Sequence, residues 1–224
     1  MNRKKIRKIS ISRAVFFVVY AFALPSFAQK GADQININGQ FVLAAKAGRA
    51  ERVAALLAEG AAVNSRDRNG DSPLNMAAGK GNEALLDILV RAGADVNLAN
   101  LSGVTPLMGA AFSGKPEMIR KLLVAGAKID AVDRVKKNAA IYAAGQGCNA
   151  CLTELLQAGT KVNARLDNDS TLLMWATGYG HDSTASFLLE QGADRSLKDN
   201  RGKTAADIAR DGNFTALAKL LEKN

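Results

Sequence analysis

Apolar and polar positions repeat along this chain with a period of 33 residues. Leucine recurs at one position in successive units, at Leu56, Leu89, Leu122, Leu155, Leu188 and Leu221. A residue able to cap a helix recurs at another, at Ser72, Thr105, Asn138, Thr171 and Thr204. Glycine recurs at a third, at Gly60, Gly93, Gly126, Gly159 and Gly192, with no insertion between units. A fixed period in the range of roughly 20 to 50 residues predicts a solenoid of copied units rather than one globular core.

Each unit is predicted to contain a short helix followed by a longer one. The hydroxyl or amide oxygens of the capping column can accept hydrogen bonds from the first free N–H groups of a helix. Pro73 and Pro106 follow two of these residues, in the first helical position, where a missing N–H has no cost. In the longer helix, for example residues 83–91, Leu85 and Leu89 have the spacing of a core-facing stripe.

The remaining part of each unit, for example residues 94–103, is too short and too polar for a third helix. Asn69-Gly70 is a dipeptide typical of tight hairpins, because both central residues of that turn need positive φ. We therefore expect β-hairpin fingers between the helix pairs.

Two segments, GDSPLNMAAGKGNEALLDILVRAGADVN and GVTPLMGAAFSGKPEMIRKLLVAGAKID, resemble ankyrin repeats. This resemblance covers residues 40–224 and implies an all-α solenoid of stacked helix pairs, whose concave surface binds other proteins. The expected full repeats are residues 69–101, 102–134, 135–167 and 168–200, between an N-terminal cap at 40–68 and a C-terminal cap at 201–224. Lys136 stands where the finger glycine is expected and Ala139 where proline is expected, so repeat 135–167 is expected to match least well.

The first 28 residues have the pattern of a secretory signal peptide. A basic stretch, MNRKKIRKISISR, precedes the apolar AVFFVVYAFAL and the small residues Ser26 and Ala28. The apolar run is about half of the roughly 20 residues that a spanning helix requires, although an uncleaved anchor is the alternative. We expect cleavage after Ala28, location in the periplasm, and a flexible leader at residues 29–39.

The signal segment also accounts for most of the positive charge. It holds six of the 30 Lys and Arg residues and none of the Asp and Glu, so 24 basic residues remain against 21 acidic ones. The mature chain is only mildly basic, and the sequence pI of 9.7 gives no support to nucleic-acid binding. We expect protein partners, no nucleic acid, no membrane contact after cleavage, and a monomer in isolation.

Cys148 and Cys151 form the motif CNAC at the start of a predicted second helix. Residues three apart in a helix fall within the Cα separation of roughly 4.4 to 6.8 Å that a disulfide needs. Three interpretations are open: a disulfide or idle thiols, a redox-sensitive switch, and a catalytic redox centre. A thioredoxin-like centre is the least favoured, since no βαβ pattern surrounds the pair.

Little in the chain indicates catalysis. His181 is the only histidine, and the family resemblance places it at the start of a second helix. Asp167 and Asp169 fall in a finger, where turn residues are a better interpretation than paired catalytic carboxylates. No phosphate-binding glycine loop, cysteine and histidine cluster or nucleophile elbow is present, so we expect no enzyme activity, no cofactor and no metal.

The candidate partner-binding residues lie in the fingers and at the ends of the first helices: Arg66, Arg68, Phe112, Arg134, Lys136, Tyr179, Arg201 and Lys203. Aspartates are interleaved with the finger cations, so these either form a mixed solvated edge or steer an acidic partner. Tyr142 and Trp175 share one column and are expected to be partly buried. The leading hypothesis is a non-enzymatic protein-binding module, and the alternative is a redox-linked protective or regulatory protein that uses Cys148 and Cys151.

Overall fold

The computed structural model describes residues 27–222, with side chains from Ile37 onward except that of Asp167. Two compact units are distinguished, residues 1–36 and residues 37–224. Residues 1–26 of the predicted signal peptide lie outside the described residues. Within residues 27–222, no helix combines the length and the apolar character needed to cross a membrane.

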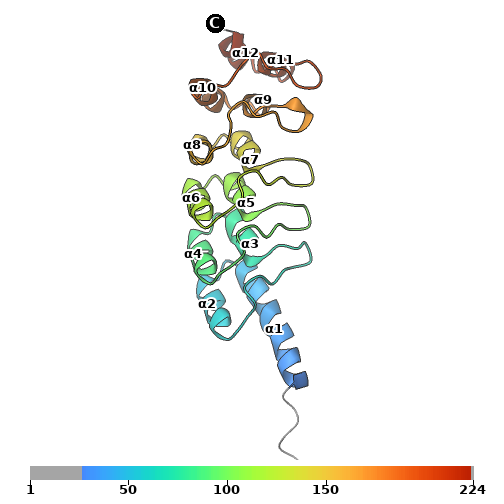
Figure 1. Ribbon diagram of the computed structural model, residues 1–224, viewed down its shortest axis with the longest axis vertical. Coiled ribbons are helices and arrows are strands. Elements are labelled where there is room, and N and C mark those ends of the chain that lie inside the picture. The colour runs from blue at the N-terminus through green and yellow to red at the C-terminus, as the bar shows by residue number, and fades with distance from the viewer. Residues whose placement is uncertain (1–26, 223–224) are drawn as a thin grey trace, which may run out of the picture. The chain divides into compact units, whose positions relative to one another are not determined.

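Helices and connecting loops make up the whole described chain, as the repeat predicts. The α-helices are α1 (Phe27–Lys46), α2 (Ala50–Ala58), α3 (Pro73–Gly79), α4 (Glu83–Arg91), α5 (Pro106–Phe112), α6 (Pro116–Val124), α7 (Ala139–Gly145), α8 (Asn149–Gln157), α9 (Leu172–Gly178), α10 (Asp182–Glu190), α11 (Ala205–Asp211) and α12 (Thr215–Glu222), with a 3-10 turn η1 (Asp167–Asp169). In the second unit, α3, α5, α7, α9 and α11 form an inner row, and the even-numbered helices lie beside them (Figure 1). The finger loops project from the inner row (Figure 1). The all-α class is confirmed.

The capping column begins each inner helix, as predicted. The Ser72 hydroxyl accepts a hydrogen bond from the backbone N–H of Asn75, at 3.2 Å, and Pro73 occupies the first helical position. Asn138 caps α7 in the same way, from Ile141 at 3.0 Å, although no proline follows it. Asn and Ser are among the strongest N-caps, so each short helix begins at a defined residue.

The core runs as a continuous stripe through the stack. The predicted leucine column is buried throughout, with Leu56, Leu89, Leu122, Leu155, Leu188 and Leu221 at most 3% exposed. Small residues bring the inner helices together: a Cβ added to Gly109 of α5 would lie 3.0 Å from the backbone nitrogen of Gly79 in α3. This close approach explains why Ala and Gly dominate the inner helices.

The fingers turn back on themselves as predicted, but within the described part of the chain they contain no β-strands. In one finger, Asp67 N–H donates to the Asp71 carbonyl and Gly70 N–H donates to the Asp67 carbonyl, both at 3.0 Å. No strand is assigned within residues 27–222, because one such pair is too short to extend into a ladder. Neighbouring fingers are joined instead, since Leu101 N–H donates to the Asn69 carbonyl at 2.9 Å.

Residues 29–39, the predicted flexible leader, fall within a helix, and their flexibility stays a prediction. Helix α1 includes them, running from Phe27 to Lys46. At the start of the second unit, the Asn38 side chain accepts from Ala62 N–H at 2.8 Å, and Phe41 is fully buried. The Asn38 contact depends on the packed structure, and the polar composition of residues 29–39 did not indicate it.

Candidate functional site

Three adjoining cavities lie along the inner helices. Their volumes are 440, 150 and 290 Å³; Phe112 and Tyr142 line the first two, and Trp175 and Tyr179 line the last two. We call this series the inner groove. It extends from Lys46 at the end of α1 to Arg201 and Ile208, beside the bases of the fingers, and its lining comes from successive units along the stack.

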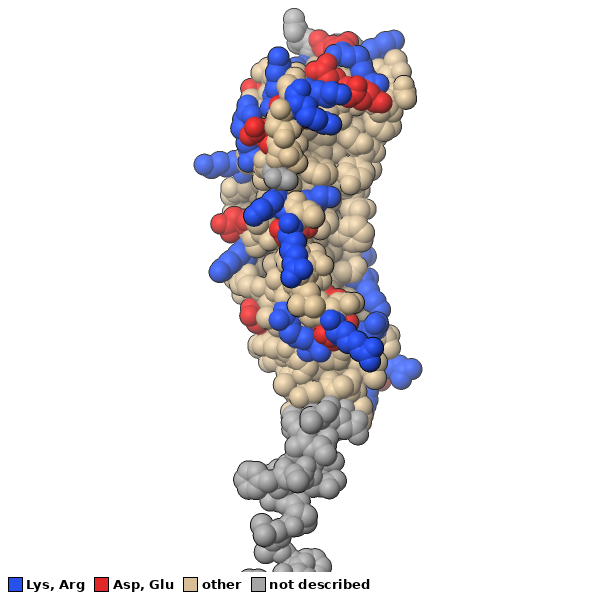
Figure 2. Space-filling view, turned by 90° about the vertical axis from the view of Figure 1, so that its right-hand side faces the viewer, with Lys and Arg blue, Asp and Glu red and all other residues tan. Residues whose placement is uncertain are grey.

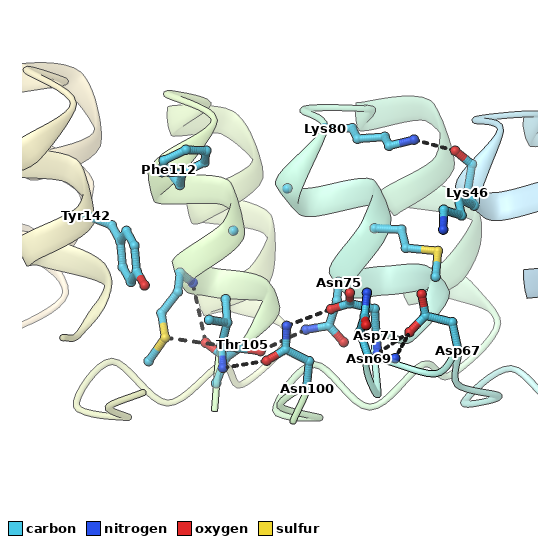
Figure 3. A pocket seen from close by; sticks show the side chains of 15 residues that line it. Lys46, Asp67, Asn69, Asp71, Asn75, Lys80, Asn100, Thr105, Phe112 and Tyr142 are labelled. Carbon is cyan, nitrogen blue, oxygen red and sulfur yellow. Dashed lines mark hydrogen bonds between the residues drawn. The ribbon is translucent and has the colours of Figure 1, made fainter. Parts of the chain in front are cut away.

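The first cavity is polar at its N-terminal end (Figure 3). Asn100 donates its side-chain N–H to Asp71 at 2.7 Å, and Asn75 donates to the Val104 carbonyl at 3.1 Å. Lys80 donates to the backbone carbonyl of Lys46. The first bond joins two successive fingers and the other two run between adjacent units, so the polar end of the groove is already ordered without a partner.

Aromatic side chains dominate the other end of the groove. Phe112 and Tyr179 are 53% and 55% exposed, which is unusual for such large apolar groups. Tyr142 meets Phe112 edge to face, with ring centroids 6.2 Å apart, and Trp175 stacks on Tyr179 at 6.3 Å. Aromatic pairs in these geometries are favourable, so the exposed rings are held by neighbours that are half-buried.

A buried carboxylate connects the groove to a finger. Asp133, only 5% exposed, accepts from the backbone N–H groups of Val135 and Lys137 at 2.9 and 2.8 Å, and from the Tyr142 hydroxyl at 2.6 Å. Burial, followed by the bond to Asp133 and its charge, raises the pKa of Tyr142 above its ordinary value. The phenol therefore remains a donor over the whole physiological pH range, and the bond persists.

Lys137 continues from this finger to the next unit. Its ammonium lies 4.7 Å from the centre of the Trp175 ring, within the range of a cation–π contact. The indole N–H of Trp175 is buried and has no acceptor among the described residues. As predicted, Tyr142 and Trp175 are both half-buried, and they pack against the exposed rings of Phe112 and Tyr179.

A family model described as ankyrin repeats, in three copies, matches residues 41–133 and 136–224. The chain belongs to the ankyrin-repeat family. Ankyrin repeats generally mediate protein–protein interaction and are typically not enzymes. No curated protein matches this chain.

Lys and Arg gather along the finger edge of the ankyrin stack, with Asp and Glu between them (Figure 2). Of the predicted finger cations, Arg68, Arg134 and Lys136 are exposed. Lys136 has φ of 61°, so its finger keeps the left-handed conformation that Gly70, Gly103 and Gly202 adopt in three other fingers. Arg66 is also exposed, yet it donates to the carbonyl oxygens of Gly70, at 2.9 Å, and Ala99, so it joins two fingers.

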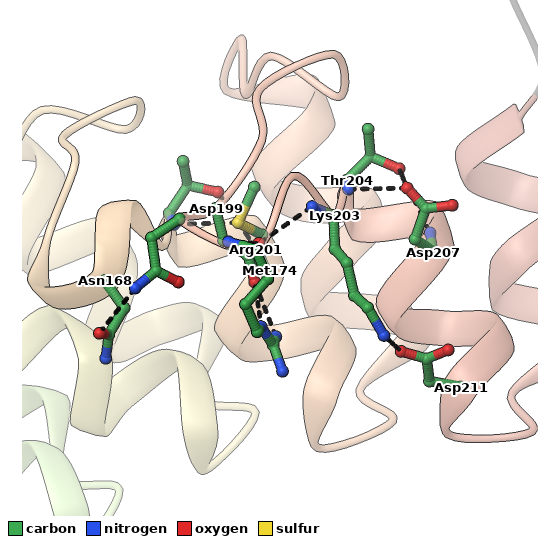
Figure 4. A network of polar contacts seen from close by, with 10 residues as sticks. Asn168, Met174, Asp199, Arg201, Lys203, Thr204, Asp207 and Asp211 are labelled. Carbon is green, nitrogen blue, oxygen red and sulfur yellow. Dashed lines mark hydrogen bonds and ion pairs between the residues drawn. The ribbon is translucent and has the colours of Figure 1, made fainter.

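The two last predicted cations take part in a polar network in the C-terminal finger (Figure 4). Arg201 donates twice to Asp199, at 2.9 and 2.7 Å, and Lys203 pairs with Asp211. Burial alone would raise the pKa of Asp199, but hydrogen bonds from Lys203 and Arg201 lower it. Arg66, Arg201 and Lys203 thus have intramolecular roles, and a contact with a partner stays a prediction for all eight residues.

The CNAC motif is a disulfide in this structure. Cys148 and Cys151 are bonded, with Cα atoms 5.2 Å apart, as the spacing predicts. His181 is the residue before α10, in agreement with the ankyrin resemblance. Its Nε2 lies 2.9 Å from the Gly145 carbonyl oxygen and its ring stacks on Tyr179, so it packs between two units. The side chains that the structure describes contain no group of three or more His, Cys, Asp or Glu suited to a metal ion.

The side chains that anchor the finger turns were not predicted from the sequence. The finger turns are anchored by Asp67, Asn100, Asp133 and Asp199, whose side chains accept from N–H groups two and four residues later. These residues recur in the 33-residue register, so the column was visible in the sequence. Asx turns of this kind are the reason that Asp and Asn favour tight loops.

Proposed function

We propose that this protein is a non-enzymatic ankyrin module of the periplasm, which binds a partner protein in the inner groove and along the exposed fingers. The observation that carries the proposal is the pair Phe112 and Tyr179. Each ring is more than half exposed and is held by a second aromatic side chain. Large aromatic groups are enriched among binding hot spots, and groups ordered before binding lose little entropy on association.

Charge supports an acidic partner. Arg68, Arg134 and Lys136 are exposed on the fingers, and the interleaved Asp133 is buried and already bonded. A partner would therefore meet the exposed cations directly, whereas the Asp133 carboxylate lies beneath the surface. The field of such cations accelerates encounter with an acidic surface and weakens as salt screens it.

Export is supported by the N-terminal sequence alone, through its basic, apolar and small-residue segments. In the periplasm, after cleavage at Ala28, the module acts as a monomer on protein targets. Neither nucleic acid nor the membrane is a partner in this proposal.

The test begins with the mature chain as bait in an envelope extract of its own host, at low and high salt. A discrete captured protein is then purified, and the Kd of its complex with this chain is measured. The chain used is isolated from the periplasm, and its mass shows whether residues 1–28 have been removed. Replacing Phe112, Arg134, Lys136 and Tyr179 together by alanine should weaken binding by about 100-fold or more, as several hot-spot contacts would require.

The control removes comparable groups from the other side of the stack. Val124 is 85% exposed on α6, and Arg91 and Lys219 are exposed on α4 and α12. Their joint replacement by alanine should leave Kd within about twofold, as expected for positions outside the interface. Both variants must keep the helical circular dichroism of the parent. An unchanged Kd in the folded quadruple variant would reject the inner groove as the binding surface.

A further inference from the structure

The two sulfurs of the CNAC disulfide have unequal surroundings. Cys148 is the N-cap residue of α8 and is partly exposed, whereas Cys151 lies in the first turn and is fully buried. Solvent therefore reaches Cys148, whereas Cys151 is shielded. Reactive cysteines are distinguished from inert structural ones by such partial exposure.

The space beside Cys148 is also unusual for its position in the repeat. In other units, the residue preceding or capping the second helix covers a loop glycine of the unit before it. A Cβ added to Gly81 would lie 2.8 Å from Lys115, and one added to Gly147 would lie 3.0 Å from His181. Cys148 stands in the same register, yet the equivalent Cβ at Gly114 would have no atom within 4 Å.

This difference follows from the short side chain of Cys148 and from its bond to Cys151. Its sulfur is bonded to Cys151 within α8, so it does not extend over Gly114 as its counterparts do over their glycines. The result is an uncovered space over Gly114 in the α5–α6 turn, on the side where the equivalent residues of other units lie. An attacking sulfur needs such access, because thiol–disulfide exchange proceeds by direct approach to one sulfur.

The local backbone also favours the reduced form. Cys151 N–H donates to the Cys148 sulfur at 3.2 Å, in the way that Leu85 N–H donates to the capping oxygen of Asn82 at 3.1 Å in α4. An anion at a helix N-terminus is stabilised by the free N–H groups and the helix dipole. When the disulfide opens, the Cys148 thiolate therefore finds a donor already in position.

A change of shape is not the expected result of reduction. The bonded residues are three apart and lie within one helical turn, so the disulfide joins no two units of the stack. The packing of α8 rests on the buried side chains of Cys151, Leu152 and Leu155, and reduction removes none of these groups. A redox role must therefore reside in the chemistry of the sulfurs themselves.

We propose that Cys148 and Cys151 form a thiol–disulfide exchange site that oxidises a protein dithiol. A thiolate of the donor attacks the Cys148 sulfur, the bond to Cys151 breaks, and Cys151 leaves as a thiolate that takes up a proton. The second donor thiol loses its proton and attacks the donor's own sulfur in the mixed disulfide, and Cys148 is released as a thiolate that takes up a proton. Two electrons and two protons have then passed from the donor, which ends as a disulfide, to this chain, which ends as a dithiol.

The first test uses the full exported chain with its disulfide intact and dithiothreitol as the dithiol. Reduction of the disulfide is monitored under native conditions: free thiols are trapped with an alkylating reagent, and the mass of the chain is measured. The rate should rise in proportion to dithiothreitol concentration while the helical circular dichroism stays constant. A rate that is independent of dithiothreitol and equal to the rate of global unfolding would show a structural bond only, and would overturn the proposal.

The second test separates the two sulfurs with a matched pair of variants. Cys151→Ala leaves the exposed thiol, and Cys148→Ser leaves the buried thiol while keeping a capping hydroxyl. Glutathione disulfide should form a mixed disulfide with Cys151→Ala about 100-fold faster than with Cys148→Ser, because exposure and thiolate stabilisation both favour Cys148. Equal rates in the two folded variants would contradict the assignment.

Thiol–disulfide exchange at the proposed site and partner binding in the inner groove can be tested separately. The variant with alanine at Phe112, Arg134, Lys136 and Tyr179 should react with dithiothreitol at the parent rate, since it leaves both cysteines in place. Conversely, Cys148→Ser should bind the captured partner with unchanged Kd. Loss of exchange in the first variant, in a folded protein, would mean that the site depends on the groove and would contradict its independence.

Discussion

Two neighbouring fingers close equivalent turns in different ways. At residues 133–137, Asp133 accepts from the N–H groups two and four residues later, and only Lys136 has positive φ. At residues 166–170, Leu166 stands in the place of the aspartate, and both Asn168 and Asp169 have positive φ, 58° and 57°. The backbone pairing is retained in both fingers, so the side-chain anchor determines how much left-handed backbone the turn requires.

The anchor also determines how each finger is connected to the groove. Asp133 binds the Tyr142 hydroxyl, which joins its finger to α7. Trp175 takes the equivalent place in α9, and its N–H has no acceptor within the part of the chain that the structure describes. Lys137, from the preceding finger, covers the indole ring instead. The anchored finger thus supports the aromatic surface of two units.

Removing the anchor should have the largest effect on stability. Asp133→Ala leaves the N–H groups of Val135 and Lys137 and the Tyr142 hydroxyl without their acceptor, and we expect a loss of about 2–4 kcal/mol in the free energy of unfolding. Urea denaturation followed by circular dichroism measures it. Tyr142→Phe, which removes one of the three bonds, should cost about 1 kcal/mol. A loss below about 0.5 kcal/mol for Asp133→Ala would show that the anchor is not important.

Acid should act on the C-terminal finger through Asp199, which has the same anchoring role. Its folded-state pKa is lowered, and hydrogen bonds from Thr204 lower that of Asp207 to about 2. A lowered folded-state pKa stabilises the fold above the unfolded-state value, about 3.9 for Asp, and this contribution is lost as pH falls toward the folded-state value. The free energy of unfolding should therefore decrease between about pH 4 and pH 2.

A variant assigns this decrease to its source. Asp199→Asn keeps an oxygen acceptor but does not titrate, so its free energy of unfolding should fall less steeply than that of the parent over the same pH range. Denaturation curves at a series of pH values measure both slopes. Identical slopes for parent and variant would show that Asp199 contributes nothing to the acid sensitivity.

Much of this architecture was predictable because the repeat has a constant register. The spacing of Leu85 and Leu89 placed the helix at residues 83–91, where α4 lies, and the capping column located the starts of the inner helices. The separation of Cys148 and Cys151 by three residues was sufficient to predict a feasible disulfide. Short-range periodic features of this kind depend on local geometry, which the sequence specifies directly.

Contacts between units were less predictable. Phe112 and Tyr142 stand 30 residues apart, outside the register, so their pairing depends on where two side chains extend from neighbouring helices. The open space at Gly114 follows from the short, disulfide-bonded side chain of Cys148, and no composition signal marks it. The Asx column was visible in the sequence, but its bond to Tyr142 needed the packed structure.

The smallest effect is expected from restoring the missing anchor. In Leu166→Asp the new carboxylate can accept from N–H groups two and four residues later, as Asp133 does, and we expect a gain of about 0.5–1 kcal/mol. Leu166 is half-buried against the core, so part of this gain is offset by lost apolar contact. Leu166→Ala loses that contact without adding an acceptor, and is the control in the same urea titration. If the aspartate variant is no more stable than the alanine variant, the left-handed pair at Asn168 and Asp169 prevents the anchored turn from forming.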